Sequence, residues 1–379
     1  MKRQIGLLLT VSFSFFSLVC CKTEKKEPTT VASIKVNTTY TNPLSVEFGD
    51  PYILDDGNGT YYMYGTGGGA KEGFATYSSN NLIDWEFEGQ VYKGNTKYSW
   101  CVANFWAPEV YKIDNKYYLF FSADWRNNPT NALENFKIGV AVSNSPKGPF
   151  LDLKNEPLFD PGYPIIDANV FKDDNDKYYL YYSRACYIHS VESDIADWAK
   201  QEGLYNEIEE SWVYGVELAP DFKSVIGDPV LLLSPPKKID DKNAESVTSK
   251  EINRRWTEGS YTFKYHGTYY MMYSANYFLG KNYAVGYATA SHPLGPYTKA
   301  NNNPVLEKNI NKGGRVTGTG HNSIVFLDGG KKMYAVYHGR TKETGKERFV
   351  FIDQIKILED GKLVVHGPTT EPMLRPLNK

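Results

Sequence analysis

The chain has 379 residues, and its 41% hydrophobic and 23% charged content is typical of a globular protein with one large domain or two ordinary ones. The formal net charge of −2 gives no electrostatic reason to expect nucleic acid or an anionic membrane surface as a partner. Aromatic residues reach 15%, including 30 tyrosines, and such side chains favour pleated sheet surfaces.

The N-terminal residues have the pattern of a bacterial lipoprotein signal. Lys2 and Arg3 precede an apolar run, residues 5–19, that is too short to span a membrane. The run ends in SLVCC, with a leucine three positions and a small residue one position before Cys21. Cys21 is therefore the predicted lipidated residue, and an ordinary cleaved signal peptide is the alternative.

This pattern divides the chain into three parts. Residues 1–21 are predicted to be the signal peptide, 22–40 a flexible tether and 41–379 the folded domain. The protein is then expected to be secreted across the inner membrane and to be periplasmic or on the cell surface. Its N-terminal lipid would be its only attachment to a membrane.

Five apolar strand-like segments, each opening near an acid or a histidine, are each followed by a Tyr-rich strand. The first segments are GDPYIL, WAPEVY, IIDANVF, TEGSYTF and GHNSIVF, which contain Asp50, Glu109, Asp167, Glu258 and His321. Their partners are GTYYMYGT, NKYYLFFSAD, DKYYLYYSR, GTYYMMYSAN and KKMYAVYHGR. A strand repeat of roughly 40–50 residues predicts an all-β fold, a single five-bladed β-propeller.

The third blade departs from the others. After its Tyr-rich strand come SVESDIADWAKQEGLY and a strand pair around WVYGVEL and SVIGDPVLLL. A polar stretch then leads to blade four, with a short helix expected over residues 244–255. We expect this excursion to form a wall of the site, because Trp256 stands two residues before Glu258.

The polar residues of the first strands predict an active site. In a propeller these strands start near the central axis, so Asp50, Asp167 and Glu258, in equivalent blade positions, should meet in one pocket. Glycosidic cleavage needs an acid for the leaving oxygen and a carboxylate to activate water or attack directly. A third carboxylate can raise the pKa of that acid. Each acid alone is better explained as a turn or strand residue, but together the three indicate an enzyme.

In this order, GDPYIL, WAPEV, IIDANVF, TEGSYTF and GTGHN resemble glycoside hydrolase family 43, over about residues 45–375. That family consists of five-bladed propellers that are inverting arabinofuranosidases, arabinanases and xylosidases. The resemblance implies that Asp50 is the general base, Asp167 the orienting and pKa-raising acid, and Glu258 the general acid. Ala168 and Ser260 replace prolines that are usual in the family motifs, and neither change removes a carboxylate.

The resemblance implies two further site residues. Arg348 matches an arginine placed near the sugar and the base, and His321 matches a position that faces a central Ca²⁺ through the propeller channel. Since Ca²⁺ prefers oxygen ligands, a structural ion there would be held mostly by water. We expect no organic cofactor.

Other side chains carry weaker expectations. Trp106 is expected to stack on the sugar or wall the pocket, whereas packing explains Phe74 and Trp125 as well as a sugar contact does. Glu109 is expected to form a structural salt bridge or hydrogen bond. The two cysteines of the folded domain, Cys101 and Cys186, are expected to be either a disulfide or two buried free thiols.

The expected activity is release of a pentose, first α-L-arabinofuranose, from plant-type polysaccharide or from arabinose- or xylose-containing oligosaccharides. A β-xylosidase and an endo-arabinanase are the alternatives on the same fold. Fructan-cleaving propellers, which use a retaining route, carry Arg-Asp-Pro and Glu-Cys motifs where this chain has IIDAN and TEGSY. A non-catalytic cell-surface propeller that binds carbohydrate is the alternative of another class. The oligomeric state is open.

Overall fold

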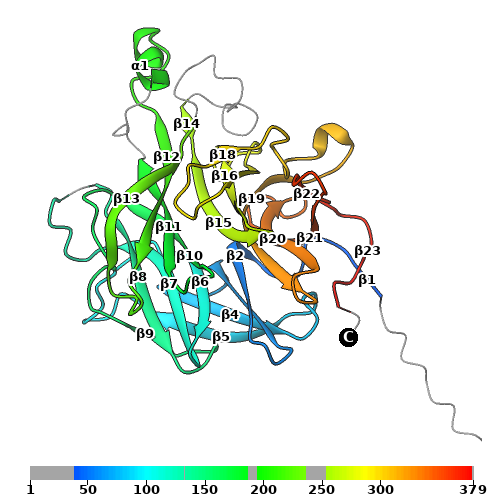
Figure 1. Cartoon of the computed structure of the whole chain (residues 1–379), viewed down its shortest axis with the longest axis horizontal. Helices are drawn as coiled ribbons and strands as arrows, with labels where there is room; N and C mark the ends of the chain where they lie inside the picture. The colour runs from blue at the N-terminus through cyan, green and yellow to red at the C-terminus, as the bar shows by residue number, and fades with distance from the viewer. Residues whose placement is uncertain (1–37, 132, 187–193, 236–252, 378–379) are drawn as a thin grey trace, which may run out of the picture. The chain divides into compact units, whose positions relative to one another are not determined.

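Five antiparallel sheets, each opened by one of the predicted strand pairs, form a five-bladed β-propeller (Figure 1). The computed structural model describes residues 38–131, 133–186, 194–235 and 253–377, all within the unit Thr38–Lys379. The predicted signal peptide, Cys21 and most of the predicted tether lie outside the described residues. Among the residues described, no helix is long and apolar enough to cross a membrane.

Each blade runs outward from its first strand through consecutive antiparallel neighbours. The first strands are β2 (Phe48–Asp55), β6 (Trp106–Ile113), β10 (Ile165–Lys172), β15 (Thr257–Tyr265) and β19 (Thr317–Leu327). The second strands are β3 (Tyr61–Gly67), β7 (Lys116–Asp124), β11 (Tyr178–Cys186), β16 (Thr268–Ala275) and β20 (Lys332–Arg340). The third are β4 (Gly73–Ser79), β8 (Phe136–Ser143), β12 (Glu209–Leu218), β17 (Ala284–Ala290) and β21 (Phe349–Ile357). The outermost are β5 (Glu86–Lys93), β9 (Leu151–Asp152), β13 (Val225–Leu233), β18 (Thr298–Lys299) and β22 (Leu363–Val365).

The five first strands form a closed ring around the centre. β2 contacts β6, β6 contacts β10, β10 contacts β15, β15 contacts β19, and β19 returns to β2. Residues more than 250 positions apart in the sequence are therefore neighbours at the axis. This ring gives the predicted site its convergence.

Aromatic side chains of the Tyr-rich strands fill the spaces between blades. Tyr64 of β3 and Phe121 of β7 are fully buried in one cluster, and Tyr337 of β20 is fully buried in another. Burying large rings on both faces of a blade stabilises the packing of sheet against sheet. The high tyrosine content is thus mainly a packing feature.

The third blade is extended as expected, but in a different way. The helix α1 (Asp194–Gln201), which the sequence analysis did not assign, buries Ala196 and Ala199 against Ile208. The helix expected over residues 244–255 does not extend to its last two residues, because Arg254–Arg255 is a strand, β14, which pairs in parallel with β12. Residues 244–252 lie outside the described residues. Trp256 follows β14 and is buried.

The two ends of the described chain meet at blade five. Strand β1 (Thr39–Tyr40), at the end of the predicted tether, pairs with β23 (Met373–Leu374). The Asn42 amide donates to the Ile352 carbonyl at 3.1 Å and accepts from the Ile352 N–H at 3.0 Å. The N-terminal segment therefore fastens to β21 without adding a strand to the blade.

Cys101 is a free, buried thiol whose sulfur lies 3.2 Å from the Tyr92 hydroxyl oxygen. The disulfide alternative for Cys101 is therefore wrong.

Candidate active site

A β-bulge interrupts every first strand at the same place. The register shifts lie between Gly49 and Tyr52, Trp106 and Glu109, Ile166 and Asn169, Glu258 and Tyr261, and Gly320 and Ser323. One residue in each bulge has a positive φ, at Asp50 (54°), Ala107 (46°), Asp167 (60°), Gly259 (56°) and His321 (51°). Four of these are not glycine, so the backbone is strained at these positions and must be held by its surroundings.

The prediction that the three acids occupy equivalent blade positions is wrong for Glu258. Asp50 and Asp167 occupy the left-handed position itself, together with Ala107, Gly259 and His321. Glu258 stands one residue earlier, in the position that Ile166 occupies in the third blade. An extra residue in a strand re-aims neighbouring side chains, which lets acids from two different positions share one pocket.

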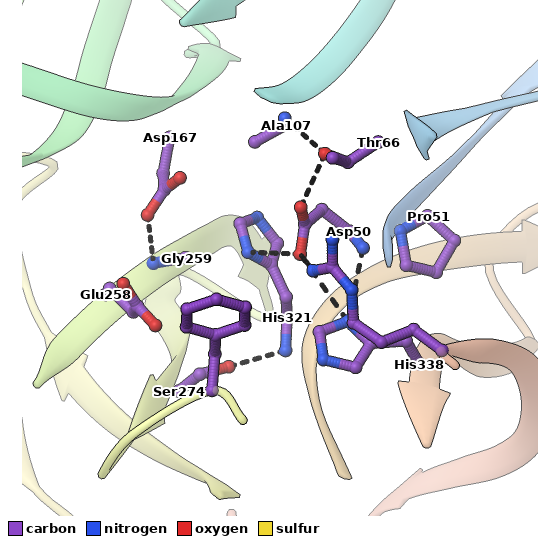
Figure 2. Close-up of polar contacts among 12 residues, drawn as sticks. Asp50, Pro51, Thr66, Ala107, Asp167, Glu258, Gly259, Ser274, His321 and His338 are labelled. Carbon is purple, nitrogen blue, oxygen red and sulfur yellow. Dashed lines mark hydrogen bonds and ion pairs between the residues drawn. The ribbon is translucent and has the colours of Figure 1, made fainter. Parts of the chain in front are cut away.

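A side chain of the preceding blade holds each left-handed residue. One polar side chain near the end of every Tyr-rich strand accepts a hydrogen bond from the backbone N–H of the next bulge, and we call these five acceptors the clamp residues. The links are Ala107 to Thr66 (2.9 Å), Asp167 to Ser122 (2.9 Å), Gly259 to Ser183 (3.3 Å), His321 to Ser274 (2.6 Å) and Asp50 to His338 (3.1 Å). Figure 2 shows the Thr66, Ser274 and His338 clamps around the site. The sequence analysis missed them, although four of the five stand five residues after the first tyrosine of their strand and His338 stands four residues after Tyr334.

The bulges surround a cavity of about 200 Å³. Six of the predicted site residues line it: Asp50, Trp106, Asp167, Glu258, His321 and Arg348. Three lining residues were not predicted: Ile166, Phe278 and Tyr283. Phe278 and Tyr283 come from the connection between β16 and β17, which lies outside the strand pairs from which the repeat was recognised. The position of Ile166 depends on a bulge that hydrophobic alternation does not reveal.

The Asp50 carboxylate lies among cationic and hydrogen-donating groups. Arg348 Nη1 lies 2.9 Å from Oδ1, and the Thr66 hydroxyl donates to Oδ2 at 2.6 Å. Nδ1 of His321 lies 3.2 Å from Oδ1. Burial alone would raise the pKa of Asp50, but these neighbours, led by Arg348, hold it well below its ordinary value. Gly49 is required here, because a Cβ at that position would overlap the Arg348 guanidinium.

The Asp167 carboxylate has a different environment. Its Oδ2 accepts the Ser183 hydroxyl at 3.0 Å and the Gly259 N–H at 3.3 Å, so it bonds directly to the residue after Glu258 (Figure 2). Burial raises the pKa of Asp167, and the charge of Asp50 adds to that rise.

The Glu258 carboxyl group lies in surroundings that favour its protonated form. Its Oε1 accepts a hydrogen bond from the Tyr283 hydroxyl at 2.8 Å. Burial, followed by the repulsion of Asp167 and then of Asp50, raises the pKa of Glu258 well above its ordinary value. The surroundings therefore favour the ionised form of Asp50 and the protonated form of Glu258 within one cavity.

Apolar side chains form the rest of the wall. Trp106 packs on Phe136, with ring centroids 4.8 Å apart, and both belong to a cluster with Ile166 and Trp256. Trp256 is therefore behind the wall rather than in it. The Phe278 ring, which also lines the cavity, has its centroid 5.5 Å from the Arg348 guanidinium carbon. Flat rings beside fixed polar groups suit the mixed surface of a sugar.

Two of the weaker predictions fail. Phe74 is 0% exposed and packs in the core against Tyr92 and Phe121, so it cannot contact a ligand in the cavity. Trp125 is not part of the cavity lining; it bridges to Cys101 and packs against the same core. Aromatic spacing alone does not distinguish such packing from a binding surface.

Glu109 has the hydrogen-bonding role expected of it. It stands two residues past the left-handed position, buried, and accepts bonds from the Tyr111 hydroxyl and, at 3.0 Å, from the Asn169 amide. Burial raises its pKa to about 8.

His321 has few partners that could help it to hold a metal ion. Within the described residues no group of three or more His, Cys, Asp or Glu side chains could hold a metal. The Nδ1 atom of His321 already faces Asp50. A Ca²⁺ ion at this position would need His321 and water as its ligands, so the calcium expectation stays a prediction.

The central cavity of the propeller holds one carboxylate beside an arginine and a second carboxyl group whose surroundings favour its protonated form. This pair is equipped for acid–base cleavage of glycosidic bonds, and the fold and site thus define a glycoside hydrolase. Residues 40–363 match Glycosyl hydrolases family 43, and the chain belongs to this family.

Relatives agree with this placement. A "Xylosidase/arabinosidase" of Bacteroides ovatus is 26% identical over 323 residues, covering 82% of this chain and 86% of the relative. The crystal structure of a thermostable family-43 glycoside hydrolase has a TM-score of 0.74 and 37% identity, covering 89% and 99% of the two chains. The endo-arabinase structure from Bacteroides thetaiotaomicron has a TM-score of 0.61 and 25% identity, covering 85% and 99%.

Proposed function

We propose that this chain is an inverting glycosidase that removes a terminal pentose, first of all α-L-arabinofuranose, from plant-type polysaccharide or oligosaccharide. Asp50 is the general base and Glu258 the general acid. Asp167 is the residue that keeps Glu258 protonated. The observation that carries the proposal is that one small cavity brings together Asp50, paired with Arg348, and Glu258, which lies near Asp167 without such a pairing.

In the proposed reaction a water attacks the anomeric carbon while the bond to the leaving oxygen breaks. Asp50 takes a proton from the water, and Glu258 gives its proton to the leaving oxygen. Afterwards Asp50 is protonated and Glu258 ionised. The nearby charge of Asp167 then favours return of a proton to Glu258. Arg348, 2.9 Å from Asp50, keeps the base ionised for the next cycle.

The size of the cavity supports exo action. At about 200 Å³ it is smaller than the roughly 300–1,000 Å³ of pockets for drug-sized ligands. Such a cavity fits one sugar ring better than a continuous chain. The walls from Trp106 and Phe278 enclose it on two sides. An endo-arabinanase, which the likeness to the Bacteroides thetaiotaomicron structure would suggest, needs a more open groove.

A β-xylosidase is the second candidate. The name of the Bacteroides ovatus relative covers both xylosidase and arabinosidase activity, and both sugars are pentoses of similar size. Turnover of aryl α-L-arabinofuranoside and aryl β-xyloside, followed by product chromatography on arabino- and xylo-oligosaccharides, separates the candidates. Higher kcat/KM on the xyloside would reverse our first choice.

The catalytic roles are tested with Asp50→Asn and Glu258→Gln. General acid or base catalysis is worth about 10²–10⁴-fold, so Asp50→Asn should lower kcat by that order on every substrate. Glu258→Gln should lose more on natural oligosaccharide than on an aryl glycoside, because a good leaving group needs less protonation. Unchanged turnover in Asp50→Asn, or equal losses in Glu258→Gln, would contradict the roles. Sugar binding without turnover in the unmodified protein would favour the non-catalytic propeller.

We further propose that Cys21 is lipidated and anchors the enzyme. Metabolic labelling with a fatty acid should mark the full chain and leave Cys21→Ser unlabelled. Equal labelling of both would overturn the anchor.

A further inference from the structure

His338 differs from the other clamp residues. Four of the five clamp residues carry a hydroxyl group, namely Thr66, Ser122, Ser183 and Ser274, whereas the clamp residue of β20 is a histidine. His338 is fully buried, and its Nδ1 accepts the Asp50 N–H at 3.1 Å. The bond holds Asp50 at φ 54°, a conformation that an aspartate seldom adopts without support.

The geometry fixes the protonation of this imidazole. An N–H donor on Asp50 requires a lone pair on Nδ1, so His338 is neutral with its proton on Nε2. Burial, and next the charge of Arg348, keeps the pKa of His338 well below its ordinary value. The other groups that face it are the Asp50 carboxylate, His321 and Arg340.

The neutral imidazole does not optimise stability. Among the described residues its Nε2 has no hydrogen-bond partner. A buried, unpaired donor costs about 1–3 kcal/mol, and a serine at this position would avoid that cost. The residue is therefore better explained by what it does for Asp50 than by its contribution to folding.

We propose that His338 is a positioning residue for the base: its Nδ1 lone pair locks the Asp50 backbone and so aims the carboxylate at the attacking water. This inference rests on the proposed function of Asp50. Arg348 and Thr66 hold the carboxylate oxygens, and His338 holds the peptide from which the side chain leaves. An error of about 1 Å in such an aim can lower the rate by about 10²-fold.

His338 also contacts Tyr283, so a test must separate its effect on Asp50 from its effect on Glu258. The imidazole stacks on the Tyr283 ring, with centroids 5.6 Å apart and planes 14° apart, and Tyr283 bonds Glu258. A change at His338 could thus act on the base through Nδ1 or on the acid through Tyr283. The two routes predict different substrate dependence, because only the acid matters more for a poor leaving group.

The experiment compares His338→Asn with His338→Phe. Asparagine places an amide oxygen near the Nδ1 position and keeps the acceptor without the ring, whereas phenylalanine keeps the ring without the acceptor. We expect His338→Asn to retain kcat within about fivefold and His338→Phe to lose about 10–100-fold, with KM little changed. The loss should be equal for good and poor leaving groups. His338→Gln, whose amide lies near the Nε2 position, should behave like His338→Phe and replaces it if that variant does not fold.

Full activity in both His338→Phe and His338→Gln, which lack an acceptor at the Nδ1 position, would overturn the inference. A larger loss of kcat in His338→Asn than in His338→Phe would also overturn it. A loss confined to poor leaving groups would also overturn it, because it would assign the effect to Tyr283. Asp50→Asn, measured in the same assay, separates this result from a failure of the proposed function. An inactive Asp50→Asn with a fully active His338→Phe would leave the function standing and remove only the role of His338.

Discussion

At the scale of single residues, the chemistry depends on three carboxyl groups with unlike neighbours. Arg348 lies 2.9 Å from Asp50, whereas Glu258 accepts a hydrogen bond from the Tyr283 hydroxyl and is repelled by the charges of Asp167 and Asp50. Placing acids together without cations is unfavourable unless a proton is retained. The opposite pKa shifts of Asp50 and Glu258 therefore follow from the side chains that surround each carboxyl group.

The basic limb of the pH profile should follow the pKa of Glu258. Asp167→Asn removes a nearby negative charge, so the pKa of Glu258 should fall and the limb of kcat/KM should move to lower pH. Tyr283→Phe removes a donor that stabilises the ionised form, so the limb should move to higher pH. The measurement is kcat/KM against pH on an aryl glycoside. Shifts in the same direction for both variants would refute this explanation of the acid.

At the scale of elements, the bulge with its clamp residue is the repeated unit that builds the site. The Tyr-rich strands and the acids of their partners could be predicted from sequence, because period-two patterns and turn residues carry that information. The register of these strands at the bulges could not be predicted from the sequence. Glu258 was expected to be equivalent to Asp50, and the bulge places it one residue earlier. Phe278 and Tyr283 could not be predicted, since nothing in the repeat indicates that their connection reaches the axis.

The bulge geometry also makes a stability prediction. Ala107 has φ 46° and no charged side chain, so Ala107→Gly should relieve about 1–2 kcal/mol of strain, partly offset by greater freedom of the unfolded chain. We expect the melting temperature to rise by about 1–3 °C in calorimetry.

The matched control is Gly259→Ala at the equivalent position. Its new Cβ would lie 3.0 Å from the His321 ring at φ 56°, so this variant should melt earlier than the unmodified protein. If Ala107→Gly were destabilising or Gly259→Ala neutral, strain at the bulges would not be the explanation.

At the scale of the whole molecule, hydrogen bonds around the axis connect the blades. Glu109 of blade two accepts from Asn169 of blade three, whose side-chain oxygen accepts the Thr262 N–H of blade four at 3.0 Å. Glu109 was expected to have a structural role, but its link across three blades could not be predicted. It depends on which side chains the bulges direct into the centre.

Glu109 should make the enzyme less stable in alkali. Its pKa is about 8 in the folded protein and near 4.5 when unfolded, so the stability that Glu109 contributes is fully present below pH 4.5 and is lost as the pH rises toward 8. Glu109→Gln keeps the acceptor without the charge. It should match the unmodified protein at pH 5 and exceed it at pH 9 by on the order of 2 kcal/mol. Denaturant unfolding at both pH values measures this, and an equal difference at the two would contradict the assignment.

The stereochemistry of the released sugar tests the central claim, that Asp50 directs a water against the bond that Glu258 protonates. Proton NMR during hydrolysis of an aryl α-L-arabinofuranoside, before mutarotation, shows which anomer forms first. The proposed mechanism predicts the inverted β-anomer. First appearance of the α-anomer would contradict it, because the configuration would then be retained and Asp50 could not be activating water for a single displacement.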